Sequence, residues 1–413
     1  MSIRHGQNLL FFLFMIYSSC AQNRKQKLKQ LMLQKYVIRY HLAMKGLLMK
    51  RKFAIMLACL MLVGSLAGCS SPTPTTTAPA TKAPETAPVT TKAATQAPET
   101  TPADTSITIT DQGGNTVTLE KPAERIVTCF YGQTYAMIAL GLQDRLIAIE
   151  HNAAKRPIYG KAAPELIDLP DVGSLKEFNV EAALAMNPDV MLLPKKLKDT
   201  ASAFEAVGIP VVICYPESCE LLEEQLMMIA TICGMPERAE ALISYYNDTF
   251  AKLAELTGSL AEADKPVVYM GSVSSYLSTA PKTMYQASLI TNAGGINAAQ
   301  DVDGDYWTDI SYEQLLAMNP DYIILPSEAK YTPEDVLGDE QLSELKAVKE
   351  GKVFAMPNAF EAWDSPVPSG ILGSLWLLAI LHGDRYSMDE MRAEAVSFYQ
   401  TFYGFEADAS LIQ

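Results

Sequence analysis

Two segments of the chain, 132 positions apart, are near copies of each other. Residues 178–194 read FNVEAALAMNPDVMLLP and residues 310–326 read ISYEQLLAMNPDYIILP, with nine of the seventeen positions identical. A period of this length is too long for a solenoid and matches the size of a compact domain. The repeat therefore predicts two similar lobes, and the cleft between them is the first place to look for a function.

Each copy carries the signals of one helix that leads into one buried strand. Asn179 and Ser311 are suited to begin a helix, because their side chains can accept hydrogen bonds from the free N–H groups of the first turn. The helix should end at the Asn-Pro pair, since proline lacks an N–H and its ring clashes with the preceding turn. The apolar runs 190–193 and 322–325 then suit parallel strands that are covered on both faces. Such units build an open α/β sheet, which binds ligands beyond the carboxyl ends of its strands.

The amino-terminal part is typical of export and tethering rather than of a fold. Residues 49–69 have a basic start, an apolar run and the ending LAGC, which resembles a bacterial lipoprotein signal whose cysteine, here Cys69, is acylated. The run is too short for a comfortable membrane span, although a transmembrane helix with a chance cysteine is the alternative. Residues 1–48 are interpreted as an over-extended start. Residues 70–106, rich in Thr, Pro and Ala, are expected to form a disordered tether.

Charge and cysteine content limit the class of protein. Eleven of the 33 Lys and Arg lie in residues 1–69 and all 47 Asp and Glu lie beyond, so the formal charge after residue 69 is −25. This excess argues against nucleic-acid binding and suits a soluble body outside the cytoplasm. There Cys214 and Cys219 could form a disulfide, and buried free thiols are the equal alternative. Zinc is not expected, because the sequence has no C-x-x-C motif and few histidines.

Several motifs in a fixed order resemble a known family. They are ITITDQGGNTVTLEKPAERIVT at 107–128, LGLQDRLIAIE at 140–150, the two repeat units, and a long amphipathic helix between the lobes. Together they are similar to the ferric-siderophore, haem and cobalamin class of ABC-importer solute-binding proteins, over nearly all of residues 107–405.

The resemblance implies an α/β fold of two Rossmann-like lobes with mostly parallel sheets. The lobes would be residues 107–235 and 265–413, joined by a single long helix at 236–258, with a ligand cleft between them. The resemblance also implies a monomer that performs no catalysis and holds no resident cofactor. A lipid anchor would hold it at the outer face of the cytoplasmic membrane, as in Gram-positive organisms, where its partner is an ABC permease dimer with its ATPase.

In this family one glutamate on each lobe docks onto arginines of the permease. Glu181 and Glu313 occupy those positions at the starts of the two repeated helices. A carboxylate in a first turn also stabilises a helix by itself through the helix dipole, which is the structural alternative. Retention of both glutamates while their neighbours differ favours docking.

A large chelate needs aromatic walls and a few oriented polar groups. Core packing is the alternative for each aromatic residue, and a solvated loop is the alternative for the lysines. His151 and Arg156 lie after the second strand, and His151 is a candidate haem ligand. The predicted ligand-binding residues are Tyr131, Lys195, Lys196, Tyr276, Tyr306, Trp307 and Trp363.

The sequence favours one kind of cargo and argues against two other classes of protein. We expect an iron-siderophore chelate, because lysines suit an anionic chelate and no clear haem ligand is present; haem and a corrinoid are the alternatives. A two-domain α/β enzyme is opposed by the absence of a G-x-G-x-x-G or Walker motif. A zinc or manganese receptor is opposed by the lack of a histidine-rich set of ligands.

Overall fold

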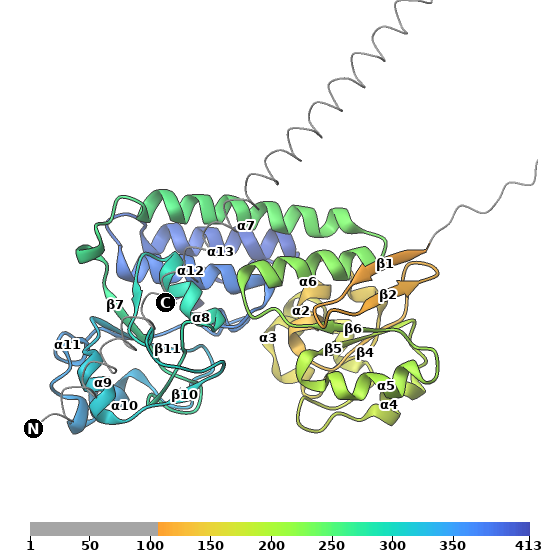
Figure 1. Cartoon of the computed structure of the whole chain (residues 1–413). Helices are drawn as coiled ribbons and strands as arrows, with labels where there is room; N and C mark the ends of the chain where they lie inside the picture. Colours follow the sequence, from red (N-terminus) through yellow and green to blue (C-terminus); the bar gives the residue numbers. More distant parts are fainter. Residues whose placement is uncertain (1–105) are drawn as a thin grey trace, which may run out of the picture. The chain divides into compact units, whose positions relative to one another are not determined.

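The computed structural model describes residues 106–413, which belong to one compact unit, 98–413. The predictions for residues 1–48, for the signal that ends at Cys69 and for nearly all of the tether lie outside the described residues. Two four-stranded parallel sheets form the centre of the described part (Figure 1). The first contains β3 (Ile126–Thr128), β4 (Leu146–Ala148), β5 (Val190–Pro194) and β6 (Val211–Cys214). The second contains β7 (Val267–Met270), β9 (Ile296–Asn297), β11 (Tyr322–Leu325) and β12 (Val353–Ala355).

The two sheets have the same topology. The first has the strand order β4-β3-β5-β6 and the second has the order β12-β11-β7-β9. When the strands of each sheet are numbered along the chain, both sheets have the order 2-1-3-4. The sequence repeat supplies the third strand of each sheet, β5 and β11. The prediction of an α/β fold built from two similar lobes is therefore confirmed.

The repeated Asn-Pro-Asp segment has a defined structural role. Asn187 and Asn319 both adopt positive φ, 46° and 40°, a conformation that asparagine tolerates better than most residues and that ends the helix. The aspartate that follows then accepts a backbone N–H from a neighbouring segment. Asp189 Oδ2 accepts from Arg125 N at 3.1 Å, and Asp321 Oδ2 accepts from Val267 N at 2.7 Å. Each repeat thus joins its third strand to the start of the first strand of the same sheet.

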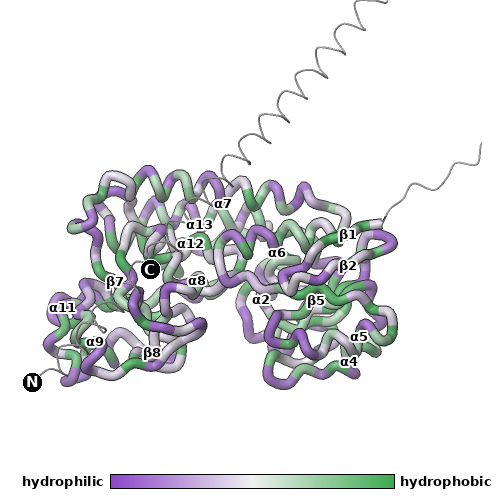
Figure 2. The backbone as a smooth tube through the Cα atoms, in the orientation of Figure 1, coloured by the Kyte–Doolittle hydropathy of each residue, from purple (hydrophilic) through white to green (hydrophobic). Residues whose placement is uncertain are grey.

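Both faces of the two sheets are buried, as the apolar runs predicted. Along β5, Val190 and Leu192 pack into one hydrophobic cluster while Met191 and Leu193 pack into another. This division follows from the alternation of side chains along a strand. Figure 2 shows the same contrast, with hydrophobic colour on β5 and mixed colour along the partly exposed helix α7.

One hydrophobic core cluster extends through both lobes. A second cluster covers the other face of the first sheet, and a third cluster covers the other face of the second sheet. The helix α7 (Pro236–Thr257) contributes to the shared cluster through Ala239, Leu242, Tyr246 and Leu253. It contacts α6 of the first lobe as well as α8 and α12 of the second lobe. The Tyr246 hydroxyl also donates to the carbonyl of Pro368 at 2.6 Å. A continuous core beneath one long helix should limit how far the lobes can move.

The remaining elements cover the sheets or form two small antiparallel pairs of strands. The pairs are β1 (Ile107–Thr110) with β2 (Thr116–Leu119), which form a hairpin, and β8 (Ser278–Thr279) with β10 (Thr308–Asp309). Helices of the first lobe are α2 (Tyr131–Ala139), α3 (Pro157–Ala162), α4 (Val180–Ala185), α5 (Ala201–Glu205) and α6 (Cys219–Ile232). Helices of the second lobe are α8 (Tyr285–Asn292), α9 (Tyr312–Met318), α10 (Pro333–Leu337), α11 (Lys346–Lys349), α12 (Ile371–Leu381) and α13 (Met388–Phe402).

Candidate ligand cleft

The strand order fixes where a ligand site is expected. In a parallel sheet of order 2-1-3-4, the connections diverge between strands 1 and 3, and ligands bind beyond the carboxyl ends of those strands. In the first lobe Tyr131 follows β3 and Lys195 follows β5. In the second lobe Glu328 comes shortly after β11. These positions define the candidate cleft.

An arginine connects the two lobes at one side of this cleft. Arg156 lies in the segment after β4, and its guanidinium carbon is 4.0 Å from the centroid of the Tyr131 ring. Arg156 Nη1 is 3.4 Å from Glu328 Oε1 in the second lobe, so the two groups form an ion pair across the cleft. The Arg156 side chain is 26% exposed and the Glu328 side chain is 54% exposed. Both groups therefore remain accessible to solvent.

Tyr131 lies near polar groups of the second lobe. Burial raises the pKa of the Tyr131 hydroxyl, and the neighbouring Ser365 and Arg156 side chains partly oppose that rise. Glu328 and Asp364 act in the direction of a higher pKa, because a nearby negative charge disfavours a phenolate. Ser365, Glu328 and Asp364 all belong to the second lobe. A tyrosine of the first lobe thus faces polar groups of the second.

Lysines and tyrosines form a second contact between the lobes. Lys195 Nζ lies 3.8 Å from the centroid of the Tyr215 ring, within the first lobe. Lys196 Nζ lies 5.0 Å from the centroid of the Tyr306 ring, in the second lobe. Burial raises the pKa of the Glu217 carboxyl beside them, and the two lysines act against that rise. Both lysines therefore face aromatic and acidic groups at the strand ends.

Charged groups of both lobes lie near the cleft. Arg156, Lys195 and Lys196 come from the first lobe, where Glu217 lies beside the two lysines, and Glu328 of the second lobe pairs with Arg156. Opposite charges across a gap attract, more strongly as water is excluded from between them. An anionic ligand entering the cleft would therefore be attracted by the first lobe.

The structure places the other predicted aromatic residues differently. Tyr306 is 51% exposed and Trp307 beside it is half-buried, so both remain available to a ligand. The Tyr276 hydroxyl donates to Asp339 Oδ2 at 2.8 Å, and its ring packs edge-on against Tyr331. Tyr276 therefore has partners within the second lobe, and its contact with a ligand stays a prediction.

Trp363 requires a correction. Its side chain is only 2% exposed, and its indole N–H donates to the Tyr399 hydroxyl at 2.9 Å. The segment that leads into α12 turns this residue inward, against the aromatic side chains of α13. Core packing, the alternative for each aromatic in the sequence analysis, is what the structure shows for Trp363.

Sequence reasoning gave Arg156 too little weight and missed Tyr215 and Glu328 as site residues. Tyr215 follows β6 directly, so its place at a strand end was a usable signal. Arg156 could not be assigned in this way, because its contact with Glu328 joins residues 172 positions apart. His151 was the more prominent candidate, but its Nδ1 pairs with Asp171 of the same lobe at an exposed position.

The two candidate docking glutamates are exposed at equivalent places. Glu181 lies in the first turn of α4, where the Asn179 side chain accepts from Ala182 N at 3.0 Å. Glu313 lies in the first turn of α9, which begins with a capping box formed by Ser311. The Ser311 side chain and a backbone N–H hold the pKa of Glu313 below its usual value. An exposed, charged side chain at each site is compatible with docking, and the docking role stays a prediction.

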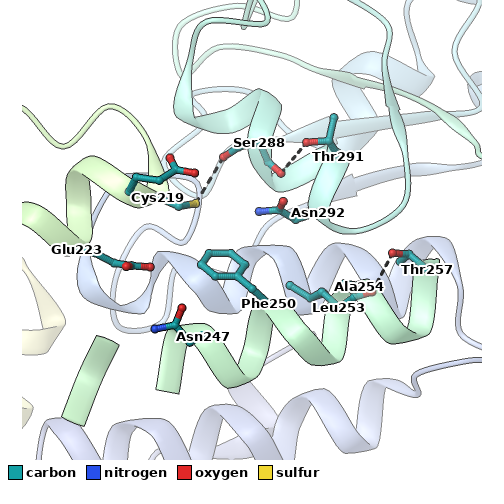
Figure 3. A pocket seen from close by; sticks show the side chains of 11 residues that line it. Cys219, Glu223, Asn247, Phe250, Leu253, Ala254, Thr257, Ser288, Thr291 and Asn292 are labelled. Carbon is teal, nitrogen blue, oxygen red and sulfur yellow. Dashed lines mark hydrogen bonds between the residues drawn. The ribbon is translucent and has the colours of Figure 1, made fainter. Parts of the chain in front are cut away.

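The four cysteines of the described residues are free thiols, so Cys214 and Cys219 are not paired. Cys214 is buried in the first lobe, whereas Cys219 begins α6 with its Sγ 3.8 Å from Ser288 Oγ of α8. Cys219 and Ser288 line a cavity of about 500 Å³ between α6, α7 and α8 (Figure 3). This cavity lies along the connecting helix and contains none of the predicted ligand-binding residues.

Residues 106–413 contain neither a metal-binding cluster nor a membrane-spanning helix. No group of three or more His, Cys, Asp or Glu side chains in this range is arranged to hold a metal ion. No helix in the same range has the length and apolar character needed to cross a membrane.

A duplicated parallel sheet, with charged and aromatic groups gathered where the lobes meet, is the architecture of a two-lobed solute-binding protein. The chain belongs to the periplasmic binding protein family, whose model matches residues 126–360, more than half of its length. It is a binding protein for transport rather than an enzyme, and it serves an ABC importer outside the cytoplasm.

The relatives agree on the class and differ in cargo. The molybdate-binding protein MolA of Haemophilus influenzae is 26% identical over 71% of this chain and 90% of its own. The uncharacterised ABC transporter substrate-binding lipoprotein YvrC of Bacillus subtilis is 24% identical over 74% of this chain and 90% of its own. A solved periplasmic solute-binding protein from Veillonella parvula is 27% identical, with a TM-score of 0.64 over 74% of this chain and 95% of that one.

Proposed function

We propose that the protein is a lipid-anchored receptor that captures an iron-siderophore-type chelate and delivers it to an ABC permease dimer with its ATPase. One observation carries the proposal: Arg156, Lys195 and Lys196 of the first lobe lie beside tyrosine rings at the strand ends. The chelate is cargo, so the protein needs no resident cofactor. Anchoring through Cys69 would keep the receptor at the outer face of the membrane.

The chemistry of these side chains suits an anionic chelate with flat, unsaturated arms. A planar guanidinium forms paired hydrogen bonds with anionic oxygens, and lysines add positive charge. Aromatic faces such as those of Tyr306 and Trp307 pack against the organic arms and fix their orientation. Arg156, Lys195 and Lys196 all belong to the first lobe, which makes that lobe the expected site of first contact for an anion.

Titration of the purified chain with a ferric catecholate, haem and cyanocobalamin tests the cargo class. We expect saturable binding of the ferric catecholate, seen as its charge-transfer absorbance and as quenching of tryptophan fluorescence. Trp307→Phe should reduce the quenching, whereas the buried Trp363 and Trp376 should contribute little. A saturable haem or corrinoid spectrum, without binding of the iron chelate, would overturn the proposed cargo.

The similarity to a molybdate-binding protein favours a small oxyanion as a second candidate. Molybdate carries two negative charges, and the same three cations could receive them. Isothermal titration calorimetry with sodium molybdate tests this candidate, and saturable heat of binding for molybdate without binding of the iron chelate would favour the oxyanion.

We also propose that Glu181 and Glu313 dock the receptor onto the permease. Both are exposed, and each lobe supplies one of them at the equivalent helix. Single exposed ion pairs contribute only about 0–1 kcal/mol, so recognition should require both lobes at once.

A further inference from the structure

Two equivalent positions of the repeat carry opposite charges. Lys196 and Glu328 are 132 residues apart, and each stands two residues after the shared proline that follows the third strand. Each also contacts the other lobe: Lys196 reaches the Tyr306 ring, and Glu328 reaches Arg156. The duplicated fold has therefore placed a cation and an anion at the same site of the two lobes, and both cross the cleft.

The contact of Glu328 leaves Arg156 only partly engaged. The guanidinium carbon lies 4.0 Å from the centroid of the Tyr131 ring, and the group is also close to Tyr135. A guanidinium has five N–H donors, so further ones can donate to a carboxylate or another oxyanion. Glu328 Oε1 lies 3.4 Å from Arg156 Nη1, a long separation for a hydrogen bond to a charged group. Because more than half of the Glu328 side chain is exposed, it can turn into solvent when the contact is broken.

We propose that Glu328 is an internal competitor that holds Arg156 in the ligand-free protein and is displaced by the anionic group of the cargo. This inference rests on the proposed function, because it assigns selectivity to the same cleft. A neutral ligand has no anionic group to offer Arg156, so it leaves the ion pair in place. An anionic ligand replaces the carboxylate with its own oxygens. Arg156 therefore favours anionic chelates, whereas Glu328 competes with them and admits those whose oxygens hold Arg156 better than a carboxylate does.

The first experiment measures the contact without a ligand. Hydrogen exchange of the full chain, followed by mass spectrometry, reports on the peptides that cover residues 151–157 and 326–331. Arg156→Gln and Glu328→Gln should each accelerate exchange in both peptides about two- to fivefold, the range expected for a partly exposed ion pair. The double variant should show no further increase. Glu334→Gln, an exposed substitution in the second lobe, is the matched control and should change neither peptide.

The second experiment measures selectivity with two matched probes, an anionic ferric tris-catecholate and a neutral ferric trihydroxamate. Glu328→Gln should bind the catecholate about two- to fivefold more tightly than the unchanged protein does, because the competitor is gone. Its affinity for the trihydroxamate should change less, so the preference for the anionic probe should increase in this variant. Arg156→Gln should weaken binding of the catecholate.

The outcomes separate this proposal from the function on which it rests. Unchanged exchange in residues 326–331 of Arg156→Gln would show that the pair does not form and would overturn the proposal. Catecholate binding that Glu328→Gln leaves unaltered would overturn the competitor role and leave the receptor function standing. Absence of binding of both probes to every variant would overturn the proposed cargo, and the competitor role with it.

Discussion

The two lobes share a strand order but differ in what they present to the cleft. Each places its third strand, β5 or β11, next to the first strand of its own sheet. The first lobe then presents Lys195 and Lys196 after that strand, and the second presents Ser327 and Glu328. Duplication preserved the residues that build the sheet, and the residues that face the cleft diverged. Positions that are identical in the two repeats thus indicate a structural role, and equivalent positions that differ indicate a role in the cleft.

The largest expected effect concerns the exposed glutamate that each lobe retains at the start of its repeated helix, Glu181 or Glu313. Glu181→Ala combined with Glu313→Ala should abolish uptake, because docking is expected to need a carboxylate on each lobe. Each single variant should retain part of the activity. Uptake of labelled cargo by cells measures the effect, with Glu344→Ala as an exposed control. Loss of cargo affinity in the purified double variant would instead assign these residues to the structure.

A comparison of two tryptophans of the second lobe should give the largest effect on stability. Trp363→Ala should lower the free energy of unfolding by about 3–5 kcal/mol, because it empties a buried site and leaves the Tyr399 hydroxyl without its donor. Trp307→Ala should cost far less, since that side chain is only half-buried. Urea unfolding measures both. Similar losses for the two variants would mean that Trp307 also serves the core.

Each lobe buries a carboxyl group held by tyrosine, Glu150 with Tyr159 and Glu361 with Tyr403. Burial raises the pKa of Glu361 from 4.5 to about 7, although Ser369 and the tyrosines partly oppose it. A group whose pKa is raised by folding stabilises the protein fully below its unfolded value and loses that contribution as pH rises.

Glu361 should therefore make the protein less stable, by roughly 3 kcal/mol at most, as pH increases from about 4.5 to above 7. Glu361→Gln keeps an acceptor for Tyr403 and should show a flatter pH dependence between those limits. Urea unfolding at pH 5 and pH 8 gives the comparison, with the exposed Glu344→Gln as control. Equal slopes for the variant and the unchanged protein would contradict the raised pKa.

The smallest predicted effects concern the repeated aspartates. Asp189→Ala and Asp321→Ala should each lower the free energy of unfolding by about 1–3 kcal/mol. The first removes the acceptor of the Glu124 and Arg125 N–H groups, and the second removes the acceptor of the Val267 N–H and the partner of Lys346. The two losses should be similar and additive, as the sites lie in different sheets. Unfolding curves of the two single variants and the double variant test this. A negligible loss at one site would show that the lobes use the repeat differently.

Much of the fold could be predicted from local sequence. The caps at Asn179 and Ser311, the Asn-Pro helix ends and the doubly buried strands depend on neighbouring residues and on the periodicity of the chain. The site was predicted less well. Tyr131, Lys195 and Lys196 were placed at strand ends from topology, but Trp363 was assigned to the cleft although it belongs to the core.

The sequence alone determined that the protein is one fold built twice, because a 17-residue repeat carries its own helix, turn and strand signals. Only the tertiary structure decided which side chains meet across the lobes. Arg156 and Glu328 are 172 residues apart, and no local pattern encodes their contact. Their approach depends on the packing of both sheets against one shared core. The cleft is therefore a product of the whole fold, whereas the lobes are a product of the repeat.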